Sequence, residues 1–68
     1  RGEKDKALAD FNRSLRLVPQ NPVNYVNRAQ LYYQSGDHAL ALRDLVTALA
    51  IRPDYQRAID LKAVINKE

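Results

Sequence analysis

The sequence of 68 residues contains no cysteine and only one histidine, two glycines and three prolines. Without cysteine no disulfide can form, and without clustered cysteine or histidine a structural zinc site is excluded as well. A chain this short leaves much of its surface in water, so its stability has to come from the packing of regular elements. We expect neither a metal nor a cofactor.

Long apolar runs and blocks of like charge are also missing. No apolar run approaches the ~20 residues that a membrane-spanning helix needs, and the N-terminus lacks the pattern of a signal peptide. The formal charge is +3 and the pI about 9.5, but no block of five or more like charges occurs that would form a nucleic-acid-binding tail. We expect a soluble chain without a membrane partner. The lack of cysteine suits the cytoplasm and does not exclude the periplasm.

The sequence does contain an internal repeat with an interval of 34 residues. This interval separates Gly2 from Gly36 and Pro19 from Pro53. Between them, the identical pairs are Ala7 and Ala41, Leu8 and Leu42, Asp10 and Asp44, and Leu15 and Leu49. Self-similarity at such an interval is typical of an array of helical hairpins.

The apolar periodicity predicts an all-α fold of four antiparallel helices, over about 3–18, 22–35, 38–51 and 55–66. The inner faces are expected to be Ala7, Leu8, Phe11, Leu15 and Val18 in the first helix; Tyr25, Ala29 and Tyr32 in the second; Ala41, Leu42, Leu45, Ala48 and Leu49 in the third; and Ala58, Ile59, Leu61, Val64 and Ile65 in the fourth.

Proline, glycine and short polar residues predict where the helices begin and end. Pro19 and Pro53 end the first and third helices, because proline lacks an N–H and disfavours helical geometry in the residue before it. Asn21 before Pro22 predicts a capped start for the second helix. Gly36 suits the left-handed residue just beyond that helix, and Gly2 stands at the equivalent place one interval earlier. The expected caps of the third and fourth helices are Asp37 and Asp54.

These residues carry a family resemblance. The pattern of Tyr25, Ala29, Tyr32, Gly36, Ala41, Leu45, Ala48 and Pro53 resembles the tetratricopeptide repeat at nearly every signature position. Residues 22–55 resemble one complete repeat. Residues 1–21, through Gly2, Ala7, Phe11 and Pro19, resemble the second helix of a preceding repeat, and residues 56–68 the first helix of a following repeat or a capping helix. The family usually has leucine where this chain has Arg28, and often an aromatic residue at His38.

The resemblance implies a right-handed solenoid of αα-hairpins whose first helices line a concave groove that binds a peptide or helix of a partner protein. The expected lining residues are Val23, Val26, Asn27, Gln30, Tyr33, Gln34, Arg57, Asp60 and Leu61. The resemblance extends to the carboxylate-clamp subgroup, which binds the acidic C-terminal tails of heat-shock chaperones. Asn27 and Arg57 match two of the five clamp positions. At a third position, where the subgroup has a basic residue, this chain has Leu61, and Lys62 is one residue away.

The sequence also bears on three other functions: self-association, RNA binding and catalysis. The chain could be a self-associating structural fragment, excised or designed, whose half-repeat ends are covered by a second copy, since about three repeats are normally needed for stability. RNA binding is disfavoured because the arginines are dispersed and the tyrosines occupy packing positions. If RNA did bind, its affinity would fall steeply with added salt. Catalysis is disfavoured because His38, Ser14 and Ser35 lack an obvious base and orienting partner, and because no phosphate loop or metal spacing occurs.

Overall fold

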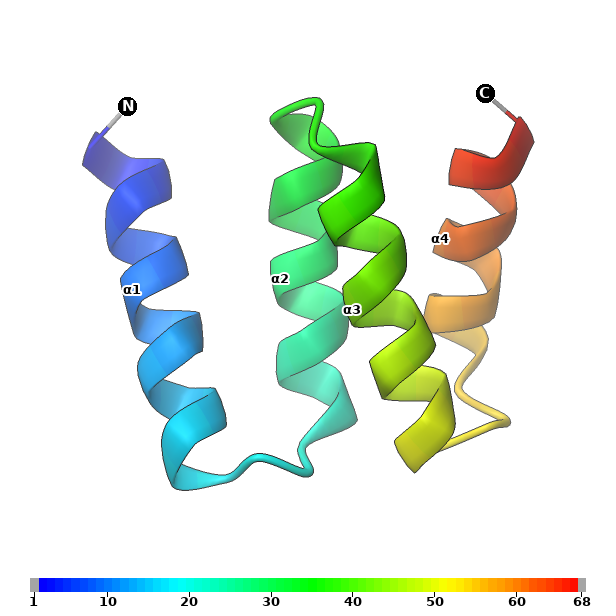
Figure 1. The fold of residues 1–68 in the computed structure, drawn as a ribbon, viewed down its shortest axis with the longest axis horizontal. Coiled ribbons are helices and arrows are strands. Elements are labelled where there is room, and N and C mark those ends of the chain that lie inside the picture. Colours follow the sequence, from blue (N-terminus) through cyan, green and yellow to red (C-terminus); the bar gives the residue numbers. More distant parts are fainter. Residues whose placement is uncertain (1, 68) are drawn as a thin grey trace.

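The computed structural model describes residues 2–67, which form four α-helices joined by short connections. They are α1 (Gly2–Leu17), α2 (Pro22–Gln34), α3 (His38–Ile51) and α4 (Gln56–Lys67), and neighbouring helices run antiparallel (Figure 1). The predicted all-α fold is confirmed, and each predicted helix end lies within one residue of the observed one. The left-handed conformation predicted at Gly2 depends on the preceding residue, which lies outside the described residues.

The N-cap predicted before α2 and the left-handed glycine predicted after α2 are both present. Asn21 has an extended backbone with φ of −97°, and its Oδ1 accepts a hydrogen bond from the N–H of Val23 at 3.1 Å. Beyond α2, Gly36 has φ of +86°. The N–H of Gly36 donates to the carbonyl of Tyr33 and the N–H of Asp37 to that of Tyr32, at 3.1 and 2.8 Å. These two bonds form a Schellman motif, which needs a left-handed residue.

The predicted caps of α3 and α4 need correction. Asp37 stands at the N-cap position of α3, but its side chain makes no capping hydrogen bond. Asp54 does not cap α4, because that helix begins later, at Gln56, and the carbonyl of Tyr55 accepts the N–H groups of Ala58 and Ile59 at 3.1 Å. The Asp54 carboxylate instead pairs with Arg52 at 3.5 Å on the exposed surface.

The core lies between α2, α3 and α4 and consists largely of small residues. Its buried members are Val26, Ala29, Ala41, Leu45, Ala48, Ala58 and Ile65. Alanine at the crossing points allows the helix axes to approach closely, because little side-chain volume separates the backbones. Three residues predicted to face inward are exposed: Val18, which lies beyond the end of α1, and Ile59 and Val64 on α4, which no described helix covers.

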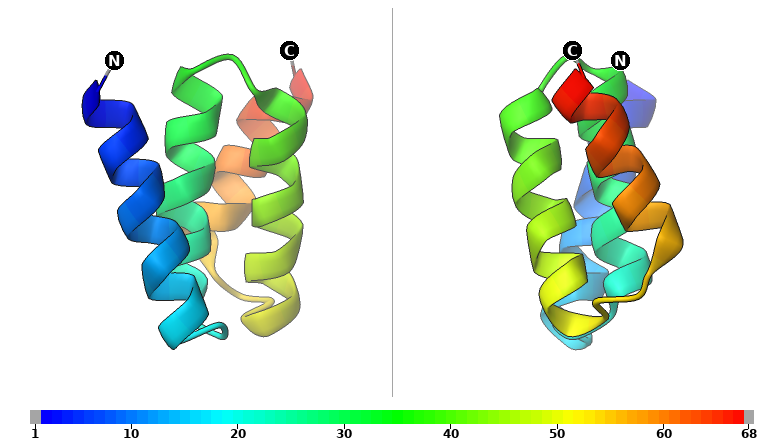
Figure 2. Two further views of the ribbon diagram at one scale, coloured as in Figure 1. Left: turned by 60° about the vertical axis from the view of Figure 1, so that its left-hand side comes forward. Right: turned by 90° about the vertical axis from the view of Figure 1, so that its right-hand side faces the viewer.

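The helices form two layers, with α3 and α4 on different sides of the molecule (Figure 2). The Cα atoms span 29 × 26 × 15 Å, and the short dimension suits two layers of helices packed 8–10 Å apart. α2 contacts all three other helices, whereas α1 packs on α2 alone among the described elements. α2 is therefore the central helix. None of the described helices is long and apolar enough to cross a membrane.

Candidate functional site

Two polar residues expected to line a groove along α2 and α4 are in contact. An Nη2 hydrogen of Arg57, on α4, is donated to Oδ1 of Asn27, on α2, at 3.2 Å. Arg57 is exposed and Asn27 half-buried. Because a guanidinium carries five N–H donors and the amide nitrogen of Asn27 carries two more, the pair keeps several donors for an incoming carboxylate.

Val26 was predicted to line the groove, and this prediction is wrong. Its side chain is only 1% exposed and belongs to the core between α2, α3 and α4. Val26 lies three residues before Ala29, so the two share the face of α2 that packs into the core. Leu61, also predicted to line the groove, is half-buried and packs against the same core.

The remaining predicted groove residues are distributed along the two helices. Val23 and Gln34, near the two ends of α2, are exposed, and Gln30 between them is half-buried. The Tyr33 ring stacks on His38 with centroids 5.2 Å apart, so it is engaged at the turn between α2 and α3. Asp60 accepts a hydrogen bond from Nε2 of Gln56 one turn earlier on α4, at 2.7 Å.

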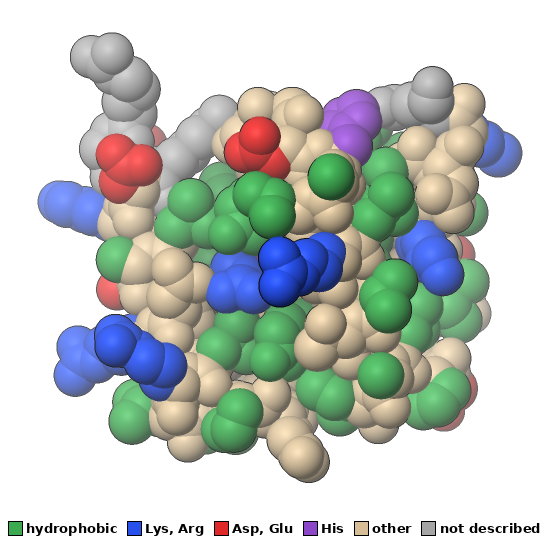
Figure 3. Space-filling view, in the orientation of Figure 1, with side chains coloured by type: hydrophobic (Ala, Val, Ile, Leu, Met, Phe, Trp, Pro, Cys, Tyr) green, Lys and Arg blue, Asp and Glu red, His purple; other side chains and the backbone are tan. Residues whose placement is uncertain are grey.

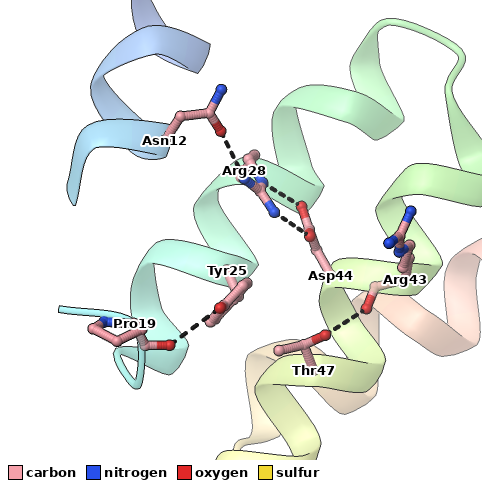
Figure 4. A network of polar contacts seen from close by, with 7 residues as sticks. All are labelled: Asn12, Pro19, Tyr25, Arg28, Arg43, Asp44 and Thr47. Atoms are coloured by element: carbon pink, nitrogen blue, oxygen red, sulfur yellow. Dashed lines mark hydrogen bonds and ion pairs between the residues drawn. The ribbon is translucent and has the colours of Figure 1, made fainter. Parts of the chain in front are cut away.

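Sequence reasoning missed a polar cluster on the other side of α2. Arg28 donates from Nε and Nη2 to the two carboxylate oxygens of Asp44 on α3, both at 2.7 Å, and from Nη1 to Oδ1 of Asn12 on α1, at 2.6 Å. Figure 4 shows these side chains pointing toward one another from three helices. Asp44 is 5% exposed, so the fork of Arg28 satisfies a carboxylate that would otherwise be buried without a partner.

Two tyrosines surround the guanidinium of Arg28. Its Cζ lies 5.7 Å from the ring centroid of Tyr25 and 5.8 Å from that of Tyr32. The hydroxyl of Tyr25 donates to the carbonyl of Pro19 at 3.1 Å, which fixes the connection between α1 and α2. The hydrogen bonding of Arg28 to the Asp44 carboxylate raises the pKa of Arg28, and burial opposes this effect.

Two open hollows flank this cluster on the face formed by α1 and α3. The first has a volume of about 510 Å³ and is lined by Asn12, Leu15, Arg16, Tyr25 and Arg28. The second, of about 340 Å³, is lined by Tyr25, Arg28, Tyr32, Leu40, Arg43, Asp44 and Thr47. Figure 3 shows basic side chains at the centre of this face, with hydrophobic side chains around them.

A signal for the cluster was present in the sequence. Arg28 departs from the leucine that the family usually has, and Asp44 stands directly before Leu45 on the apolar face of α3. A cation and an anion that each interrupt an apolar face are more stable when they pair, because an unpaired buried charge is costly. The interval of 34 residues between Asp10 and Asp44 instead indicated only the repeat.

His38, one of the residues considered for catalysis, begins α3 and stacks on Tyr33 with ring centroids 5.2 Å apart. Within residues 2–67, no group of three or more His, Cys, Asp or Glu side chains could hold a metal ion.

Comparison with known proteins identifies the repeat. The sequence profile of the family described as "Tetratricopeptide repeat" matches residues 1–66. The heat-shock protein cognate co-chaperone sgt12 of Aspergillus fumigatus is 36% identical over 85% of this chain and 17% of its own. DnaJ homolog subfamily C member 3 of Gallus gallus is 29% identical over 97% of this chain and 13% of its own. Tetratricopeptide repeat protein 36 of Bos taurus is 42% identical over 74% and 27%.

The chain therefore spans only a small part of the relatives that it matches. No solved structure matches the chain. The profile and the co-chaperone relatives support a protein–protein interaction module. With four helices in two layers and a profile match over nearly its whole length, the chain belongs to the tetratricopeptide repeat family.

Proposed function

We propose that the chain binds a peptide or helix of a partner protein in the concave groove along α2 and α4. The observation that carries the proposal is the contact between Arg57 and Asn27, which places hydrogen-bond donors from both helices at one point of that surface. Val23 and Val64, both more than 40% exposed, add apolar surface on the same two helices. Residues 22–55 act as the complete repeat, with 1–21 and 56–68 as the flanking half repeats.

The donors at Arg57 and Asn27 favour a ligand with a carboxylate. A planar guanidinium can bind both oxygens of a carboxylate, and charge-assisted hydrogen bonds of this kind are stronger than neutral ones. The similar protein sgt12 is a heat-shock cognate co-chaperone, and the carboxylate-clamp subgroup binds the acidic tails of heat-shock chaperones. The chain has only two of the five clamp positions, so we expect weaker binding than a complete clamp gives. As a binding module, it is expected to have no catalytic activity.

This proposal can be tested by titrating the chain with an acidic peptide that has a free C-terminal carboxylate. Replacing Arg57→Gln should weaken binding about tenfold, because hydrogen bonds to charged groups contribute roughly 1.5 kcal/mol or more. The matched control is Arg52→Gln, since Arg52 pairs with Asp54 away from the groove. Equal affinity of wild type and the Arg57 variant would contradict the proposal.

A second candidate function is self-association of the 68-residue chain through α4 and α1. The 34-residue interval places Lys62 at the position of Arg28, Ala63 at that of Ala29, and Asp10 at that of Asp44. The packing of α2 on α3 thus offers a template for α4 of one copy on α1 of the next. Ile59, 39% exposed, and exposed Ala63 lie on the uncovered side of α4.

Sedimentation equilibrium over a wide range of concentration tests this second candidate. The apparent mass of the wild-type chain should rise with concentration, and Ala63→Arg should keep the chain monomeric. Ala50→Arg is the matched control, because Ala50 is exposed on α3 outside this surface. A wild-type chain that stays monomeric throughout would exclude self-association and leave the groove as the binding surface.

A further inference from the structure

We propose a second binding site, on the face opposite the concave groove, where the two hollows around Arg28 hold an acidic segment of a partner protein in an extended conformation. The site consists of Asn12 and Arg16 on α1, Arg28 and Tyr32 on α2, and Arg43 on α3. It goes beyond the groove function, because no residue of the pair Asn27 and Arg57 lines either hollow.

The charge of the site selects an anion. Arg16 lines the first hollow and Arg43 the second, and neither makes an ion pair with any residue that the structure describes. The carboxylate that lines the second hollow, that of Asp44, already accepts two hydrogen bonds from Arg28 and is almost fully buried. The uncompensated charge facing solvent in the two hollows is therefore positive.

The hydrogen-bonding groups of the site select an acceptor. Arg28 uses three of its five N–H groups, so two remain. The amide nitrogen of Asn12 and the hydroxyl of Tyr32 have no hydrogen-bond partner among residues 2–67. Both oxygens of Asp44 and the amide oxygen of Asn12 are occupied. A ligand group that only accepts hydrogen bonds, such as an ionised carboxylate, therefore fits this surface.

The shape of the site favours a polypeptide. The two hollows share Tyr25 and Arg28, so they are adjacent, and each has an apolar wall, formed by Leu15 in the first and Leu40 in the second. In an extended chain, residues i and i+2 point to the same side, so two acidic side chains separated by one residue can occupy neighbouring hollows. The apolar walls suit the methylene groups of glutamate.

The tyrosines do not favour a nucleic acid here. Sequence-tolerant binding of single strands relies on bases that stack on open aromatic faces. The guanidinium of Arg28 lies over the rings of both Tyr25 and Tyr32, so one face of each ring is already covered. An acidic peptide needs only the cations and the donors.

The test is an NMR titration of the isotope-labelled 68-residue chain with a short peptide of alternating glutamate and alanine, acetylated and amidated at its ends. Blocking the C-terminus removes the carboxylate that the concave groove would bind. We expect shifts at the side-chain amide of Asn12 and at the Nε–H groups of Arg16, Arg28 and Arg43. The resonances of Asn27 and Arg57 should remain in place, and a glutamine–alanine peptide should cause no shifts.

Variants separate a specific site from diffuse attraction. Arg16→Gln and Arg43→Gln should each weaken binding about fivefold, the usual upper value for one partly exposed charge pair. Replacement of both by lysine should retain most of the affinity. Arg13→Gln is the matched control, because Arg13 is an exposed arginine on the same helix as Arg16 that lines neither hollow.

Four results would overturn the proposal: no binding of the glutamate peptide, shifts confined to Asn27 and Arg57, an equal loss of affinity in Arg13→Gln and Arg16→Gln, or tighter binding of single-stranded RNA to the same residues. The second of these would support the groove instead. Conversely, loss of the groove ligand in Arg57→Gln leaves the prediction for Arg16 and Arg43 unchanged, so the two proposals fail independently.

Discussion

Arg28 joins three helices through a single guanidinium. It binds Asp44 on α3 by two hydrogen bonds of 2.7 Å and Asn12 on α1 by one of 2.6 Å. Asp44 is buried, and Arg28 keeps about a fifth of its side-chain surface in water. Such a pair stabilises the fold less through its own attraction than through the cost of leaving either charge alone. We expect its main effect to be on how the helices are placed around α2.

The first prediction concerns this pair. Arg28→Leu, which restores the residue that the family usually has, should lower the free energy of unfolding by about 3 kcal/mol, because Asp44 is then buried without a partner. The double variant Arg28→Leu/Asp44→Leu should recover most of this loss, since it buries no charge. Urea unfolding of the single and double variants measures both effects.

Asn12→Ala is the control for the contact with α1. It removes one exposed hydrogen bond and leaves Asp44 paired, so the loss should stay below about 1 kcal/mol. A double variant as unstable as Arg28→Leu alone would contradict the explanation by an unpaired buried charge.

At the scale of the helices, the two ends of α2 are fixed by different means. Its N-terminus combines the Asn21 cap with Pro22 in the first turn, and its C-terminus is closed by the Schellman motif at Gly36. α3 begins without a side-chain cap, although Asp37 stands at the right position. α3 therefore depends more on its packing against α2 than on its own ends.

The second prediction compares these helix starts. Asn21→Ala should destabilise the chain by about 1 kcal/mol, the usual cost of losing an N-cap hydrogen bond. Asp37→Ala should change stability by less than about 0.5 kcal/mol, because its side chain makes no capping bond. Thermal unfolding of both variants at one protein concentration measures the two losses of stability. A larger effect at position 37 than at position 21 would mean that the cap at α3 forms in solution.

At the scale of the whole molecule, the core is shared unequally. The central buried cluster draws its residues from α2, α3 and α4, and none of its buried members comes from α1. The buried residue of α1 is Leu15, which lies outside that cluster, and Phe11 is half-buried. α1 is thus attached to the surface of α2 and not inserted into the core.

The third prediction follows from this arrangement. In hydrogen exchange under native conditions, the amides of α2 and α3 should be the most protected, and those of α1 should exchange through local opening that leaves the other helices folded. Leu15→Ala should accelerate exchange in α1 alone. Leu45→Ala, at a position that is fully buried, should destabilise every helix by about 2–5 kcal/mol. Uniform exchange across all four helices in the Leu15 variant would show that α1 unfolds with the core.

Much of the fold could be predicted locally. The repeat interval, the prolines at 19 and 53 and the Asn21–Pro22 start depend on residues close in sequence, and the helix bounds follow them to within one residue. The sequence-based predictions were wrong for residues whose burial depends on a neighbouring helix. Val26 was expected in the groove, but it is buried in the core that α2 shares with α3 and α4. Ile59 and Val64 were expected inside, but no described helix covers either of them.

The sequence by itself therefore determined the helices, their caps at Asn21 and Gly36, the hairpin repeat and the family, because turn chemistry and apolar periodicity act over a few residues. The tertiary structure decided which polar residues meet. Arg28 and Asp44 are 16 residues apart and Asn27 and Arg57 are 30 apart, so neither contact belongs to a helical period. Each forms because the crossing of two helices brings side chains within hydrogen-bond distance, and no local pattern encodes that geometry.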